Sequence, residues 1–152
     1  MISKHLKLLA TILLGCAVSA SVPAIAHHAF SAEFDGDSPV HLRGKVTRVE
    51  WINPHAWVHL DVEQEDGTLQ EWMIEGGTPN TLLRSGITKN TLKPGTEIVV
   101  RGYQSKDHRC RPACKANGRD VTFPDGRKLF MGSSGTGAPD DAQRRRAEQG
   151  RC

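Results

Sequence analysis

Short stretches in which apolar and polar residues alternate, each bounded by turn residues, occupy most of the chain between residues 40 and 131. Alternation with a period of two is typical of a β-strand that buries one face. The breaks contain turn-forming pairs such as Asp66-Gly67 and Pro94-Gly95. This spacing predicts an antiparallel all-β domain. The predicted strands are residues 40–52, 55–64, 69–75, 96–103, a segment around Val121 and Phe123, and 128–131.

One segment, residues 78–86, carries helix signals instead. Thr78 is suited to cap the helix, Pro79 to occupy its first position and Gly86 to follow its end. Three strands, one helix and two further strands is the element order of the OB-fold, a small barrel. We therefore expect an OB-fold-like, five- to six-stranded antiparallel barrel with one short helix between strands three and four. An open sandwich of the same strands is the alternative.

The predicted strand over residues 55–64 has two different faces. Its apolar set, expected on the core side, is Val58, Leu60 and Val62, and its opposite set is His55, Trp57, His59 and Asp61. An aromatic ring on the face away from a core often marks a contact surface. Trp57 and Asp61 are therefore candidates for an interaction patch. The alternative is that an N-terminal arm covers Trp57 through Phe30 and Phe34.

The first 26 residues have the three-part layout of a secretory signal peptide. Lys4 and Lys7 precede an apolar run over residues 8–18, and small residues lead to a cleavage site after Ala26. We therefore expect export, with a lipoprotein-type cut at Cys16 as the alternative. No later apolar run is long enough to span a membrane as a helix. The expected boundaries are residues 1–26 for the signal peptide, 27–39 for an N-terminal arm, 40–132 for the barrel and 133–152 for a disordered tail.

The balance of charge argues against a nucleic-acid partner. The chain has 20 Lys and Arg residues and 17 Asp and Glu residues, and the predicted leader contains two of the basic residues and none of the acidic ones. The mature chain is therefore close to neutral. Domains that bind nucleic-acid phosphates normally carry a clear basic excess.

Cys110 and Cys114 are the natural disulfide pair in an exported chain, because they lie in one short loop. Cys152 is then left over in the tail. A soft-metal site built from His108 and the two loop cysteines is the competing interpretation. Pro112 opposes the helix that would align the two thiolates, and oxidation would remove them.

His27 becomes the first residue if the leader is cut after Ala26. Its α-amine and its imidazole could then chelate one metal ion, since an α-amine loses its proton far more readily than a lysine does. A further imidazole would favour Cu, with Zn as the other candidate. The candidates for that ligand are His28, His55 and His59, although strand spacing places His55 and His59 about 13 Å apart. The competing interpretation is a solvated His-His pair at a frayed end, with His55 bonded to its turn.

No catalytic constellation stands out in the sequence. The chain lacks a Gly-x-Ser-x-Gly elbow and a phosphate-binding loop, and Glu50 and Glu75 read as isolated carboxylates on strands. We therefore expect a binding module rather than an enzyme.

Three motifs carry a resemblance to a known family. They are His27-His28-Ala29-Phe30, Trp51-Ile52-Asn53-Pro54-His55-Ala56-Trp57 and Gly126-Arg127-Lys128-Leu129-Phe130-Met131-Gly132. The chain resembles a family of short exported bacterial proteins of unknown function, over about residues 27–135. The resemblance implies a periplasmic location and cleavage before His27, but no activity. The sequence departs from the family pattern at Ala29, where serine is usual.

Two functions are consistent with these features. The first is a small periplasmic binding module with a Cu or Zn site at the mature N-terminal His27. The second is a structural or protein-interaction module without a metal, which contacts a periplasmic partner protein through Trp57.

Overall fold

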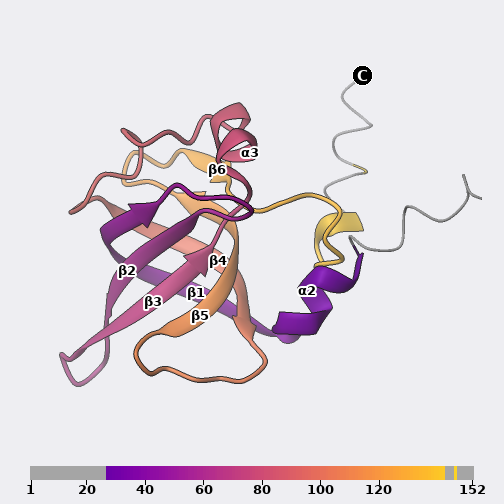
Figure 1. Ribbon diagram of the computed structural model, residues 1–152. Coiled ribbons are helices and arrows are strands. Elements are labelled where there is room, and N and C mark those ends of the chain that lie inside the picture. Colours follow the sequence, from indigo (N-terminus) through magenta and orange to yellow (C-terminus); the bar gives the residue numbers. More distant parts are fainter. Residues whose placement is uncertain (1–26, 143–145, 147–152) are drawn as a thin grey trace, which may run out of the picture.

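The computed structural model describes residues 27–142 and residue 146, which form a small β-barrel (Figure 1). The helices are α2 (His27–Glu33) and α3 (Pro79–Arg84). The strands are β1 (Phe34–Glu50), β2 (Trp57–Glu63), β3 (Leu69–Glu75), β4 (Glu97–Ser105), β5 (Cys114–Thr122) and β6 (Lys128–Phe130).

The strands form one sheet that closes on itself. Antiparallel pairs join them in the order β3-β2-β1-β4-β5-β6. A parallel pairing between β3 and β5, from Trp72 opposite Cys114 to Glu75 opposite Asn117, completes the ring. With α3 between β3 and β4, this is the arrangement of an OB-fold. The predicted fold class is confirmed, although this one pairing is parallel rather than antiparallel.

Strand β5 is the element that the sequence pattern identified only in part. The prediction found its end, whereas the strand begins at Cys114. Residues 114–120 show only a weak apolar alternation, because the inward residues Cys114, Ala116 and Gly118 are small where the strand passes close to neighbouring side chains. A Cβ atom on Gly118 would lie 2.7 Å from a methyl carbon of Ile74 and 2.8 Å from the sulfur of Met131. Large apolar residues therefore do not fit there, and hydrogen bonds to β4 and β3 hold the strand in place.

Strand β1 starts earlier than predicted, because its first residues pair with the end of β4. Phe34 lies opposite Ser105, and pairing continues from Pro39 opposite Tyr103. The segment over residues 27–39, expected to be an arm, is therefore helix α2 followed by the start of β1.

The barrel interior is filled by apolar side chains, which include the predicted core set of β2. Val58, Leu60 and Val62 are all buried. Helix α3 covers one end of the barrel and contributes the fully buried Leu82. The predicted helix is confirmed, since the Thr78 side chain accepts a hydrogen bond from the backbone N–H of Thr81 at 3.1 Å.

A second, smaller apolar cluster holds α2 against the barrel. Phe30 packs against Phe34 and edge-on against Tyr103, with ring centroids 5.8 Å and 5.5 Å apart. Ala138, from the C-terminal segment, is buried in the same cluster. Figure 1 shows α2 and this segment together at one side of the barrel. Phe30 and Phe34 are therefore used in this cluster, and Trp57 keeps a partly exposed ring.

Arg119 on β5 anchors the C-terminal segment. Its side chain is 2 % exposed. The guanidinium forms an ion pair with Asp141 and donates to Asp140 Oδ1 at 2.9 Å and to the Ser133 carbonyl at 3.0 Å. It also lies 4.9 Å from the ring centroid of Phe130. Residues 133–142, expected to be part of a disordered tail, pack against Arg119 in the structure. Composition suggested that this segment had nothing to bury, but it provides the counter-charges for a buried arginine.

Several predictions concern residues outside the described range. They include the signal peptide, the lipoprotein alternative at Cys16, and Cys152. The structure describes the backbone of His27 and His28 as part of α2, but not their side chains. In the described part of the chain, no helix combines the length and apolar character needed to cross a membrane.

We predict that Asp141→Ala lowers the free energy of unfolding by about 3 kcal/mol, because removing one partner of a buried ion pair leaves the other charge poorly compensated. Urea denaturation followed by circular dichroism measures the change. Asp37→Ala removes an exposed carboxylate from β1 and serves as the control, with an expected change below about 0.5 kcal/mol. Equal stability of the two variants would show that Arg119 does not depend on this partner.

Candidate functional site

One side of the sheet points away from the core and carries mainly polar side chains. Strand alternation and register place these side chains next to one another across four strands. We call this surface the outer face. It consists of Lys45, Arg48 and Glu50 on β1, Trp57, His59 and Asp61 on β2, Glu71, Met73 and Glu75 on β3, and Lys115 and Asn117 on β5.

His59 lies at the centre of the outer face and is held by two carboxylates. Its Nδ1 atom is 2.9 Å from Glu71 Oε1, and its Nε2 atom is 3.0 Å from Glu50 Oε1. The Nε atom of Arg48 lies 3.3 Å from Glu50 Oε1, and its Nη1 atom lies 3.7 Å from Glu71 Oε1. The imidazole is 0 % exposed although it lies on the side away from the core. Both ring nitrogens are therefore occupied by protein partners, and neither is open to a metal ion in this arrangement.

His55 lies in the connection before β2 and has a different set of partners. Its Nδ1 atom is 3.2 Å from the backbone carbonyl of Gly76, to which it donates, and 3.8 Å from Glu75 Oε1. The expectation that His55 bonds to its own turn is wrong in detail, since the carbonyl belongs to the segment after β3. Among the described residues, no group of three or more His, Cys, Asp or Glu side chains is arranged to hold a metal ion.

Glu75 is a nearly buried carboxylate at one end of the outer face. Its Oε1 atom accepts a hydrogen bond from Asn117 Nδ2 at 3.2 Å. Burial raises the pKa of Glu75 above its ordinary value; His55 and Lys115 oppose the shift and Glu33 adds to it. The other polar atom of the Asn117 carboxamide, Oδ1, is buried and has no hydrogen-bond partner among the described residues. A nearly buried carboxylate and a carboxamide oxygen without a partner among the described residues therefore belong to neighbouring side chains here.

Trp57 lies directly opposite Glu75 in the pairing of β2 with β3. Its ring is partly exposed, and the Nζ atom of Lys115 lies 5.7 Å from its centroid. That ammonium group is also 3.5 Å from Glu33 Oε1 on α2. The outward orientation expected for Trp57 from strand alternation is the one observed.

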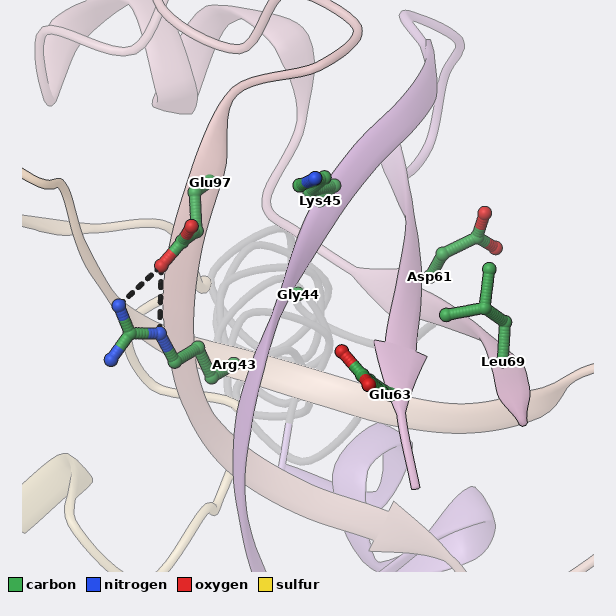
Figure 2. Close-up of a pocket in the computed structure, with 7 residues that line it drawn as sticks. All are labelled: Arg43, Gly44, Lys45, Asp61, Glu63, Leu69 and Glu97. Carbon is green, nitrogen blue, oxygen red and sulfur yellow. Dashed lines mark hydrogen bonds and ion pairs between the residues drawn. The ribbon is translucent and has the colours of Figure 1, made fainter. Parts of the chain in front are cut away.

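A shallow pocket of about 460 Å³ lies at the opposite end of the outer face, beside Asp61. Figure 2 shows β1 crossing its middle at Gly44, with the Arg43–Glu97 pair on one side. Asp61, Glu63 and Leu69 form the other side. Gly44 lets β1 and β2 approach closely, because a Cβ atom there would lie 2.5 Å from the Asp61 carbonyl oxygen.

The central strands of the outer face are acidic. β2 and β3 contain four acidic residues and no lysine or arginine. These residues are Asp61, Glu63, Glu71 and Glu75. The basic residues of this face lie on β1 and β5, at its margins. The surface therefore has no concentration of positive charge for a phosphate backbone.

The Cys110–Cys114 disulfide is present and lies at the start of β5. This confirms the predicted pairing and leaves neither thiolate available to a metal ion. The Nε2 atom of His108 lies 3.9 Å from Asp35 Oδ2.

Several residues of this site were missed or misread from the sequence. Glu50 and Glu75 are not isolated, since Glu50 contacts His59 and Glu75 contacts Asn117. Glu71 could have been found, because the Asp66-Gly67 hairpin determines which residues of β3 lie beside His59. Lys115 and Asn117 gave no signal, since their strand was not recognised and its partner in the sheet is distant in sequence.

Residues 16–112 match the family described as "Family of unknown function (DUF6152)". The chain belongs to this family. The match covers well over half of the DUF6152 chain and ends just before β5, so the Gly126–Gly132 motif lies beyond it. The expected membership of a family of unknown function is confirmed.

Among solved structures, the DUF6152 chain is similar to the mitochondrial single-stranded DNA-binding protein Rim1 of S. cerevisiae. The two share 9 % sequence identity with a TM-score of 0.43, over 63 % of this chain and 96 % of Rim1. The comparison with curated proteins found no match.

We predict that Glu75→Gln makes the DUF6152 protein more stable at pH 7.5 and that the gain shrinks as the pH falls towards 4.5, the ordinary pKa of glutamate. Above the raised folded-state pKa, the native protein bears the full cost of a buried charge. Between 4.5 and that pKa the folded state binds more protons than the unfolded state, so stability falls as the pH rises. Glutamine keeps an oxygen for the Asn117 amide and carries no charge.

Urea denaturation of wild type and Glu75→Gln across this pH range is the measurement. Glu63→Gln, at an exposed position on β2, is the matched control and should change stability little at any pH. A loss of stability in Glu75→Gln at pH 7.5 would contradict the assignment of a burial cost to this carboxylate.

Proposed function

We propose that this DUF6152 member is a non-enzymatic binding module of an exported, periplasmic protein, and that the outer face is its contact surface for a partner protein. The observation that carries the proposal is the placement of Trp57, a partly exposed aromatic ring, among ordered polar side chains on the face that the core does not use. Aromatic residues are enriched at the centres of protein interfaces.

The construction of the outer face supports this role. Its side chains stand on paired strands rather than on loops, and contact residues on such elements are positioned more precisely. The cluster of His59, Glu50, Glu71 and Arg48 orders the surface next to Trp57 through charge-assisted contacts. Because these side chains are already ordered in the free protein, less side-chain entropy is lost when a partner binds.

Charge disfavours a nucleic acid as the partner. The strands that commonly carry the ligand face of an OB-fold are β2 and β3, and in this chain they contain acidic residues but no basic ones. Phosphate groups would be repelled by such a surface, whereas a neutral or basic protein surface would not.

We predict that Trp57→Ala and Asp61→Asn lose a partner protein that the wild-type domain retains in a pull-down from a periplasmic extract. Loss of a central aromatic contact typically weakens an interface by about 2 kcal/mol or more, which is about thirtyfold in affinity. Leu83→Ser is the control, because Leu83 is 53 % exposed on α3 rather than on the outer face. Retention of every partner by a folded Trp57→Ala variant would argue against this function.

A second candidate is a Cu or Zn site at the mature N-terminus, with His27 as the first ligand and His28 as the nearest further one. The sequence supports it through the predicted cut after Ala26. The free amine and imidazole of one residue would then form a chelate.

For this candidate we predict that protein beginning at His27 binds Cu(II) tightly, whereas protein with one extra residue before His27 binds much more weakly. Isothermal titration of the two forms measures the difference, after intact mass has established the first residue of the exported protein. Equal affinities, or an exported chain that begins elsewhere, would dismiss the terminal chelate.

A further inference from the structure

We propose that Trp57, Glu75 and Asn117 form a binding site for one positively charged nitrogen group, an ammonium or guanidinium from a lysine or arginine side chain of the partner protein. This inference rests on the proposed function, because it names the chemistry that the outer face recognises.

The three residues are neighbours in the sheet. Trp57 on β2 lies opposite Glu75 on β3, and Glu75 lies opposite Asn117 on β5. Directly opposed residues on adjacent strands have Cβ atoms about 5 Å apart on one face. A ring face, a carboxylate and a carboxamide are therefore brought within reach of a single small group.

One buried polar atom of this site has no hydrogen-bond donor among the described residues. Asn117 is 5 % exposed, and its Oδ1 atom is buried without a hydrogen-bond partner in the part of the chain that the structure describes. A buried polar atom without a partner costs free energy and is rare enough in folded proteins to need an explanation. Glu75 beside it is 8 % exposed and receives one hydrogen bond, from the other end of the same carboxamide. An ammonium or guanidinium group has several N–H donors and no acceptor, so it matches two adjacent oxygen acceptors.

His55 does not donate a hydrogen bond to Glu75. Its Nδ1 atom is directed to the Gly76 carbonyl at 3.2 Å and is 3.8 Å from Glu75, beyond hydrogen-bond distance.

The ring of Trp57 already attracts a cation from the chain itself. Lys115 Nζ lies 5.7 Å from the ring centroid, within the range of a cation–π interaction, and Glu33 on α2 holds it from the other side at 3.5 Å. At the edge of the site, the Lys115 ammonium therefore makes the kind of contact with the Trp57 ring that we assign to the nitrogen group of the ligand. Arg48 and His59 contact Glu50, and Lys115 contacts Glu33, so no lysine or arginine in the described part of the chain forms an ion pair with Glu75.

The burial of Glu75 is consistent with a retained function. Desolvation raises its pKa, which means that the folded protein bears a cost for holding this charge. Carboxylates kept under such a cost are concentrated at binding and catalytic sites. A sugar ring could also stack on tryptophan, but the acidic surroundings and the cation already over the ring favour a charged nitrogen group.

The test uses two capped tripeptides, acetyl-Gly-Lys-Gly-amide and acetyl-Gly-Gln-Gly-amide, added to the purified domain at pH 7.5. Binding is followed by the NMR signals of the Trp57 indole N–H and the Asn117 side-chain amide. We expect the lysine peptide to shift both signals with saturation and the glutamine peptide to shift neither. Equal binding of the two peptides, or no binding of the lysine peptide, would overturn the proposal.

Two variants test the assignment within the site. Glu75→Gln should weaken binding of the lysine peptide roughly tenfold or more, because a hydrogen bond to a charged group is lost. We expect Glu75→Gln to fold, because the neutral glutamine keeps an oxygen for the Asn117 amide. Glu63→Gln, an acidic position elsewhere on β2, should leave the affinity unchanged. Equal weakening in both variants would show general charge attraction rather than a site.

Lys115→Met should strengthen the binding of the lysine peptide, whereas Glu75→Gln should weaken it. Removing the lysine takes away a competing cation and a like charge, so the affinity for the lysine peptide should rise severalfold. Unchanged or lower affinity would overturn the claim that the ligand occupies the ring face of Trp57. A partner protein lost in Trp57→Ala together with no peptide binding would leave the outer face as a contact surface but refute the cation site.

Discussion

The parallel pairing of β3 with β5 is the constraint on which the rest of the structure depends. It joins two strands that are separated along the chain by α3 and β4, and it turns an open sheet into a closed barrel. The Cys110–Cys114 disulfide lies at the entry to β5, and Gly118 lets this strand pass close to Ile74. The same pairing places Lys115 beside Met73 and Asn117 beside Glu75. The contact that closes the barrel therefore also brings the β5 side chains onto the outer face.

The two sides of β2 are both buried but differ in chemistry. Val58, Leu60 and Val62 point inward and are buried among apolar neighbours, where each contributes about 1.5–3 kcal/mol through burial. His59, between them in the sequence, is equally buried on the other side, but among carboxylates and an arginine. Such a cluster contributes less to folding than an apolar core would. Together with Glu75 and Asn117, it belongs to the surface that we propose as the contact site for a partner.

The C-terminal segment completes the fold by electrostatics rather than by a core of its own. Arg119 would be a costly buried charge without Asp140 and Asp141, and these aspartates would be part of a polar tail without Arg119. Ala138 joins Phe30 and Phe34, so the two ends of the described chain are held to the same side of the barrel. Glu33 at the end of α2 thereby reaches Lys115, which connects this side to the outer face.

Local patterns in the sequence determined much of this protein. Alternation identified the first four strands and the two faces of β2, and Thr78, Pro79 and Gly86 identified helix α3, because these signals act between residues close together in the chain. The disulfide followed from two cysteines in one loop. Only the tertiary structure decided that β5 begins at Cys114, that residues 133–142 pack against Arg119, and that His59 is enclosed by Glu50 and Glu71. For β5 the deciding partner, β3, is distant in sequence, whereas the partners of His59 and of residues 133–142 lie 9 to 22 residues away. In all three cases the free energy comes from hydrogen bonds and charge pairs that the fold brings together.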